Sequence, residues 1–273
     1  MRRTLALSLL APLLLTACAQ GPAPAEPSAT IQPTPSASSA PAPTASAAPV
    51  PSAPPAASAS APAALPRTVV GLGDSIMAGT NCACDGPLTA LADALERDHG
   101  VRPEVANLGV AGWTTDQLTR FVSTDADART QLADADLVVV IIGANDLFRL
   151  GTAGTATANP AALPQDLATL SDRLGSTLAA VRATDDGTPA RYLVTGYWDI
   201  LSRPDNADPR TAAATAAVNA TIAEAAADAG MTYVDLAGPF GDAGVAPLIS
   251  DDGLHPNAEG VRVIGETLAG AVA

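Results

Sequence analysis

Short apolar runs alternate with longer amphipathic segments from residue 67 to the end of the chain. The most apolar run, Leu137–Ile142, contains only Leu, Val and Ile, which is typical of a strand buried on both faces of a parallel sheet. Segments with apolar residues at helical spacing lie between such runs. The predicted strands are Thr68–Leu72, Glu104–Leu108, Leu137–Ile142, Tyr192–Thr195 and Thr232–Asp235, and the predicted helices are Leu88–Asp98, Thr115–Phe121, Leu163–Ala183, Thr211–Ala229 and Asn257–Ala269.

This alternation of strand and helix predicts an α/β domain over residues 67–273, with a parallel sheet covered by helices on both faces. Sheets of this kind bind ligands beyond the carboxyl ends of their strands. The polar segments of the domain follow predicted strands or stand just before the last helix: Gly73-Asp74-Ser75, Asn107-Leu108-Gly109, Gly143-Ala144-Asn145-Asp146 and Asp252-Gly253-Leu254-His255. We therefore expect one functional site at one rim of the sheet.

The first 66 residues have a different pattern. Residues 1–18 carry two Arg, a short apolar stretch and small residues, as in a secretory signal that is too short to span a bilayer. Leu15-Thr16-Ala17-Cys18 resembles a bacterial lipobox, which implies that Cys18 is the first mature residue and carries lipid. Cleavage after Ala19 is the alternative and would release a secreted protein.

Residues 19–66 consist almost entirely of Pro, Ala, Ser and Thr. Such a segment has little to bury and cannot offset the entropy lost on ordering. We therefore predict a disordered tether between the anchor and the domain.

Charge and composition exclude several classes of protein. The formal net charge is -14, and the 14 basic residues are all Arg and form no cluster. Because binding to phosphates needs concentrated positive charge, nucleic acid is excluded as a partner. Apart from residues 5–15 there is no long apolar run, so the expected contact with a membrane is the lipid anchor alone. We expect a monomer.

Acyl transfer needs an activated nucleophile, a base and donors for the oxyanion. Ser75 is the candidate nucleophile, and of the two histidines His255 is the candidate base, because His99 ends a predicted helix where His commonly caps carbonyls. Asp252 lies three residues before His255, close enough to orient the imidazole in a tight loop. Asp251 is interpreted as a solvated neighbour, and Asp235 is a weaker competitor.

Together the four polar segments resemble the SGNH, or GDSL, hydrolase family in their order and spacing. The resemblance implies a three-layer α/β/α fold with a flavodoxin-like parallel sheet of about five strands. It assigns Ser75, Asp252 and His255 to a catalytic triad, and the backbone N–H groups of Ser75 and Gly109 with the Asn145 amide to the oxyanion hole. It implies no metal and no cofactor.

The resulting interpretation is an exported serine esterase that acts through an acyl-enzyme on a small-molecule or envelope ester substrate. The alternatives are an envelope acyltransferase or deacetylase acting on a glycan or lipid, and a non-catalytic envelope-binding module on an esterase fold, since fold does not determine function.

Several further residues remain open at the level of sequence. Asp74 and Asp146 are expected to organise loops through hydrogen bonds to the backbone. Trp113 and Trp198 follow strands and could either line a pocket or pack beneath the loops. Cys82 and Cys84 are expected to form a local disulfide because export favours oxidation, with free thiols as the alternative.

Overall fold

The computed structural model describes residues 64–151, 159–185, 187, 190–200 and 209–273. The predicted signal segment, the candidate lipid-bearing Cys18 and all but the last three residues of the predicted tether lie outside the described residues.

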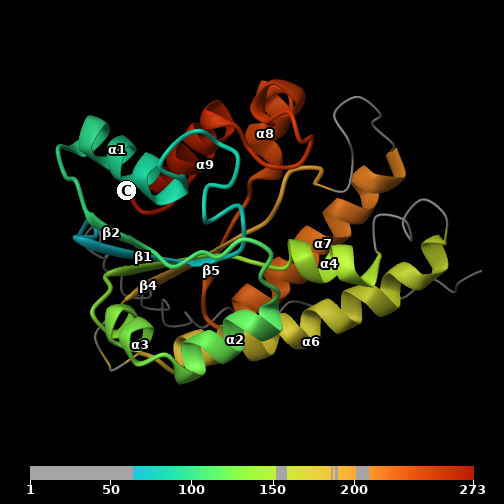
Figure 1. The fold of residues 1–273 in the computed structure, drawn as a ribbon, viewed down its shortest axis with the longest axis horizontal. Coiled ribbons are helices and arrows are strands. Elements are labelled where there is room, and N and C mark those ends of the chain that lie inside the picture. Colours follow the sequence, from blue (N-terminus) through green and yellow to red (C-terminus); the bar gives the residue numbers. More distant parts are fainter. Residues whose placement is uncertain (1–63, 152–158, 186, 188–189, 201–208) are drawn as a thin grey trace, which may run out of the picture. The chain divides into compact units, whose positions relative to one another are not determined.

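Five parallel strands form one sheet in the order β2-β1-β3-β4-β5 (Figure 1). Its strands are β1 (Thr68–Gly73), β2 (Glu104–Asn107), β3 (Leu137–Ile141), β4 (Arg191–Thr195) and β5 (Thr232–Val234). Every residue of the central strand β3 is buried, as its uninterrupted apolar run predicted. The predicted α/β class and the parallel five-stranded sheet are confirmed.

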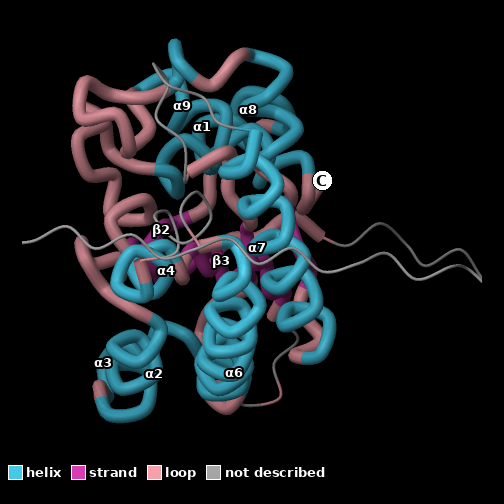
Figure 2. The backbone as a smooth tube through the Cα atoms, turned by 90° about the vertical axis from the view of Figure 1, so that its right-hand side faces the viewer, coloured by secondary structure: helices cyan, strands magenta, loops and turns pink. Residues whose placement is uncertain are grey.

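Helices cover both faces of the sheet and complete three layers (Figures 1 and 2). One face carries α1 (Pro87–His99), α8 (Ala237–Ala243) and α9 (Ala258–Gly270). The other carries α2 (Thr115–Thr124), α6 (Leu163–Arg182) and α7 (Pro209–Asp228). Two short helices, α3 (Ala126–Ala133) and α4 (Ala144–Leu150), and 3₁₀ turns at Pro160–Ala162 and Ala246–Leu248 complete the described elements.

The core explains why these segments hold together. In α1, Leu88, Leu91 and Leu95 are at most 1% exposed and share one face of the helix, since they recur at intervals of three and four residues. Burying each such side chain contributes about 1.5–3 kcal/mol. The helices therefore fix the sheet, and the sheet fixes the loops that follow its strands.

Three helices, α3, α4 and α8, were absent from the sequence prediction. α8 contains Gly238, Pro239 and Gly241, residues that disfavour helix in isolation, yet its Phe240 is fully buried and anchors it. α4 begins within the polar segment Gly143-Ala144-Asn145-Asp146 that follows β3. Among the described helices, none has both the length and the hydrophobicity that a membrane span requires.

Candidate active site

Ser75 lies in the turn that follows β1, next to the central strand. Asp74 N–H donates to the Ile141 carbonyl at the end of β3 (3.1 Å), so the pairing of the two strands continues up to the residue before Ser75. The Thr80 N–H then donates to the Ser75 carbonyl (2.9 Å). The turn therefore presents the Ser75 hydroxyl at the carboxyl edge of the sheet.

His255 and Asp252 share a tight loop before α9. The loop closes through Ser250 N–H, which donates to the His255 carbonyl (2.8 Å). Asp252 Oδ1 accepts hydrogen bonds from Ser250 Oγ and from the backbone N–H groups of Leu254 and His255, at 2.8–2.9 Å. The spacing of three residues thus lets the carboxylate fold back on its own loop, as the sequence predicted.

The two loops meet in a row of hydrogen bonds. His255 Nε2 lies 2.9 Å from Ser75 Oγ, and His255 Nδ1 lies 2.6 Å from Asp252 Oδ2. Desolvation by burial raises the pKa of Asp252, but hydrogen bonds from His255, Asn81 and Leu254 outweigh it and hold the pKa well below its usual range. A carboxylate kept ionised here can stabilise an imidazolium at His255, so the row can activate the Ser75 hydroxyl as a nucleophile.

A fourth polar side chain, which the sequence analysis missed, joins this row. Asn81 Nδ2 donates to Asp252 Oδ2 at 2.6 Å, the same oxygen that faces His255. The two residues are 171 positions apart in the chain, so no local spacing could indicate the contact. The nearest residue that the sequence analysis considered was Cys82, which directly follows Asn81.

A cavity of about 210 Å³ opens beside Ser75 and His255. Its other walls are mostly apolar, with Asn145 and Thr80 as the polar side chains, and its remaining lining residues are Ile76, Ala111, Gly112, Ala144, Phe148, Ile200 and Leu254. The cavity can hold a small apolar group next to the Ser75 hydroxyl.

The structure does not bring Gly109 to this cavity, contrary to the prediction. Its N–H donates to Asn107 Oδ1 (3.0 Å), and a Cβ at this position would lie 2.7 Å from the Ala78 backbone nitrogen. The absence of a side chain at Gly109 therefore serves close packing against the Ser75 turn. It does not expose a donor to a ligand.

Gly112 occupies the place predicted for Gly109. It lines the cavity, its φ of 82° lies in the region that favours glycine, and a Cβ there would meet nothing within 4 Å. Among the described residues, neither the Gly112 N–H nor the Ser75 N–H has a hydrogen-bond acceptor. Asn145 also lines the cavity, while its Nδ2 donates to the Trp113 carbonyl (2.8 Å), which uses one of the two amide hydrogens.

Asp74 and Asp146 organise the backbone, as predicted. Asp74 is fully buried and its Oδ1 accepts the Ile76 N–H (3.0 Å). Asp146, also fully buried, accepts Thr115 N–H and Thr115 Oγ1–H and pairs with Arg173 at 3.2 Å. The second network ties the starts of α2 and α4 to α6, and so holds Asn145 at the cavity.

The remaining candidates lie away from the reacting groups. Trp198 is 2% exposed and stacks on Phe240 at 4.4 Å between centroids, while Trp113 packs edge-on against Phe121; both tryptophans pack beneath loops and neither lines the cavity. His99 is the last residue of α1. Asp251 is exposed, and Asp235 accepts the first N–H groups of α8.

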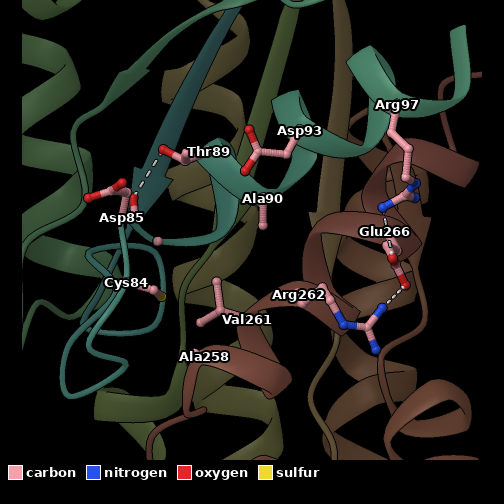
Figure 3. Close-up of a pocket in the computed structure, with 11 residues that line it drawn as sticks. Cys84, Asp85, Thr89, Ala90, Asp93, Arg97, Ala258, Val261, Arg262 and Glu266 are labelled. Carbon is pink, nitrogen blue, oxygen red and sulfur yellow. Dashed lines mark hydrogen bonds and ion pairs between the residues drawn. The ribbon is translucent and has the colours of Figure 1, made fainter.

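A larger cavity of about 360 Å³ lies between α1 and α9, and its lining includes neither Ser75, Asp252 nor His255 (Figure 3). Arg97 and Arg262 both pair with Glu266 on its wall, so their charges are already matched. Cys84 reaches the edge of this cavity and is joined to Cys82 by a disulfide, as predicted. No group of three or more potential metal ligands occurs among the described residues.

Comparison with known proteins gave one family and a set of similar folds. A profile of the GDSL-like lipase/acylhydrolase family matches residues 72–263. The lipase Lip_vut3 from a goat rumen metagenome superposes with a TM-score of 0.64 at 15% identity, covering 75% of this chain and 96% of its own. No curated protein sequence matched.

Two further structures are similar. Phospholipase A1 from Streptomyces albidoflavus NA297 has a TM-score of 0.57 at 20% identity, covering 77% of this chain and 100% of its own. A mutant form of the acetyl-xylooligosaccharide esterase Axe2 from Geobacillus stearothermophilus has a TM-score of 0.56 at 16% identity, covering 76% and 94%. At these identities the likeness concerns the fold.

Proposed function

The chain belongs to the GDSL-like lipase/acylhydrolase family and is an ester hydrolase, and from this premise we propose that it is an exported serine esterase. Ser75, His255 and Asp252 act as its catalytic triad. The observation that carries the proposal is the continuous row from Ser75 Oγ through His255 to Asp252 Oδ2, with contacts of 2.9 and 2.6 Å beside an open cavity.

In the first half of the reaction Ser75 becomes acylated. His255 Nε2 takes the hydroxyl proton as Ser75 Oγ bonds to the ester carbonyl carbon. Asp252 stabilises the imidazolium through Nδ1. The tetrahedral intermediate then collapses, the bond from the carbonyl carbon to the alcohol oxygen breaks, and the alcohol leaves with the proton held by His255.

In the second half water removes the acyl group. His255 takes a proton from water, and the hydroxide attacks the acyl carbon. The carbon–Ser75 Oγ bond breaks, the acid leaves, and His255 returns the proton to Ser75 Oγ. Each step uses the same imidazole first as base and then as acid, so its orientation by Asp252 matters twice.

The negative charge on the carbonyl oxygen needs donors that are already in place. We assign this role to the Ser75 N–H, the Gly112 N–H and the second amide hydrogen of Asn145. The assignment rests on their position around the cavity and on the two N–H groups that have no acceptor in the described part of the chain. Gly112 replaces Gly109, whose N–H is engaged by Asn107.

The cavity also limits the acyl group. About 210 Å³ with mostly apolar walls suits a short, uncharged acyl chain better than a long one or a charged one. The similar structures are a lipase, a phospholipase A1 and an acetyl-xylooligosaccharide esterase, so they do not indicate one alcohol group for the substrate. We propose short-chain esters as the substrate class.

The test is hydrolysis of p-nitrophenyl esters from acetate to long chains by the full chain. We expect the highest kcat/KM at short chains and a loss of about 10³-fold or more in kcat for Ser75→Ala. Asp252→Asn should also be severely impaired, whereas its exposed neighbour Asp251→Asn should match the wild type and serves as the control. Equal rates in the wild type and Ser75→Ala would contradict the proposed function.

A further inference from the structure

Two hydrogen bonds connect the loop that carries Ser75 with the loop that carries His255. One joins Ser75 Oγ to His255 Nε2, and the other joins Asn81 Nδ2 to Asp252 Oδ2. Among the described residues no other hydrogen bond links residues 74–86 with residues 249–257. The other hydrogen bonds that Asp252 accepts come from its own loop. Among the described residues, Asn81 therefore makes the one hydrogen bond between Asp252 and the loop of the nucleophile.

The Asn81–Asp252 hydrogen bond differs from the Ser75–His255 hydrogen bond in one respect that matters for turnover. Once Ser75 Oγ is bonded to an acyl carbon it has no hydrogen to donate, and the Ser75–His255 bond is lost. The Asn81–Asp252 bond involves neither reacting atom and persists. It can therefore keep His255 in line with the acyl carbon while water attacks.

The backbone around Asn81 is held in an uncommon conformation. In the described part of the chain the only residues other than glycine with positive φ are Asn81 (60°) and Ala83 (54°), on either side of Cys82. The left-handed backbone region is unfavourable for residues with a side chain, and it is less unfavourable for Asn than for Ala. The conformation needs an external constraint to persist.

The Cys82–Cys84 disulfide is placed to supply that constraint. It joins the residues on either side of Ala83, the residue that tolerates a positive φ less well than Asn81, and the Cα atoms of Cys82 and Cys84 lie 5.2 Å apart. Cys82 is 2% exposed and anchors the turn in the core, while Cys84 lies at the rim of the cavity between α1 and α9 (Figure 3). The bridge thus links the core to the short segment from which Asn81 projects.

We infer that Asn81 is a positioning residue for the catalytic acid–base pair, and that the Cys82–Cys84 disulfide holds its amide against Asp252. The inference rests on the proposed function of Ser75, His255 and Asp252. Its consequence is that the oxidation state of two cysteines, which touch none of the reacting groups, sets the turnover of the enzyme.

Three substitutions in this segment test the first part. Asn81→Gly removes the amide and tolerates the positive φ, and Asn81→Asp keeps the shape but replaces a donor with a second carboxylate. Ala83→Gly, in the same loop and the same backbone region, is the matched control. With p-nitrophenyl acetate we expect kcat to fall about fivefold in Asn81→Gly, the size of one hydrogen bond, and further in Asn81→Asp because like charges repel, with KM unchanged. Ala83→Gly should stay within about twofold of the wild type.

A spectroscopic measurement separates positioning from a purely structural role. The chain has two histidines, so a His99→Gln background leaves His255 as the source of imidazole signals in proton NMR. The His255 Nδ1–H resonance should change position in Asn81→Gly, because Asp252 Oδ2 then faces one donor in place of two. An unchanged resonance together with an unchanged kcat would overturn the inference.

The disulfide is tested by the double substitution Cys82→Ser with Cys84→Ser, and by dithiothreitol. In the second case two reductant thiols close to a cyclic disulfide as Cys82 and Cys84 each gain a hydrogen. We expect kcat to fall to about the level of Asn81→Gly, with no further loss when Asn81→Gly is added, since the two changes break one contact. Multiplying losses would overturn the role of the disulfide.

Failure of this inference is distinguishable from failure of the proposed function. If the wild type hydrolyses the ester and Ser75→Ala does not, while the Asn81 variants match the wild type, the esterase assignment stands and the role of Asn81 is wrong. If Ser75→Ala retains full activity, the proposed function itself is wrong.

Discussion

Asp74, the residue before the proposed nucleophile, is fully buried, and its Oδ2 has no hydrogen-bond partner among the described residues. The pKa of Asp74 is raised from 3.8 to about 7, chiefly by burial and also by the charge of Asp146, while the hydrogen bond from the Ile76 N–H lowers it. Below neutral pH the folded protein therefore keeps a proton on this carboxyl that the unfolded chain releases near pH 4. This difference makes stability depend on pH.

We expect Asp74→Asn to remove that dependence. In the wild type the raised pKa makes the free energy of unfolding fall as pH rises from about 4 to 7, where only the unfolded state loses the proton, and level off above. The stability of Asp74→Asn relative to the wild type should thus rise by up to about 4 kcal/mol across this window. Urea unfolding at pH 4 to 8 measures it, and parallel curves for both proteins would contradict it.

The two glycines after β2 show how one residue type serves two purposes. Gly109 lacks a side chain because the Ala78 backbone lies in the way, whereas Gly112 has open space around its Cα and a positive φ. The sequence has both glycines within four positions, and the structure separates them: the Gly109 N–H donates to Asn107 Oδ1, whereas the Gly112 N–H has no acceptor among the described residues.

At the scale of elements, the site depends on segments that contribute no reacting atom. The segment after β4 places Tyr197 and Trp198 in the core, and the Tyr197 hydroxyl accepts the Ala144 N–H at the start of α4 (3.1 Å). Trp198 in turn stacks on Phe240 of α8. These contacts link α4, which carries Asn145, to the opposite layer of helices.

Replacing Trp198 by Ala should therefore lower the free energy of unfolding and leave the KM for short esters unchanged. Truncation of a fully buried tryptophan lowers the free energy of unfolding by about 3–5 kcal/mol. Denaturant unfolding measures this loss, and Trp113→Ala, at a partly buried position, should lose less. A Trp198→Ala protein of unchanged stability whose KM for short esters rises would instead place Trp198 at the substrate.

At the scale of the whole molecule, we propose that the sequence comprises an N-terminal export segment, a tether and the domain. We propose that lipid on Cys18 anchors the chain in the cell envelope and that residues 19–66 hold the domain away from the membrane. The net charge of -14 gives the chain no attraction for an anionic membrane surface, so anchoring depends on the acyl chains.

Cys18→Ser should abolish this attachment. When cells that express the full chain are extracted with a detergent that separates into two phases, we expect the wild type in the detergent phase and Cys18→Ser in the aqueous phase. Both should hydrolyse a soluble ester at the same rate per molecule, because Cys18 lies outside the domain. A wild type found in the aqueous phase would show a secreted protein and contradict the anchor.

The sequence alone determined the features that local pattern encodes. The run Leu137–Ile142 predicted the buried central strand because only a strand covered on both faces tolerates such uniform hydrophobicity. The proximity of Ser75, Asp252 and His255 could be predicted because the polar segments of such a sheet gather at one edge, and because a spacing of three residues closes within a single loop.

The tertiary structure decided what depends on residues far apart in the chain. Asn81 meets Asp252 across 171 positions, Gly109 packs so closely against the Met77 side chain and the Ala78 backbone that no side chain fits there, and α8 forms because Phe240 is buried against Trp198. The local pattern predicted no element over Ala237–Ala243 and no contact for Asn81. The physical reason is that burial of a large side chain such as Phe240 outweighs unfavourable helix propensities of about 1 kcal/mol per glycine, and that long-range hydrogen-bond partners are brought together only by the folded chain.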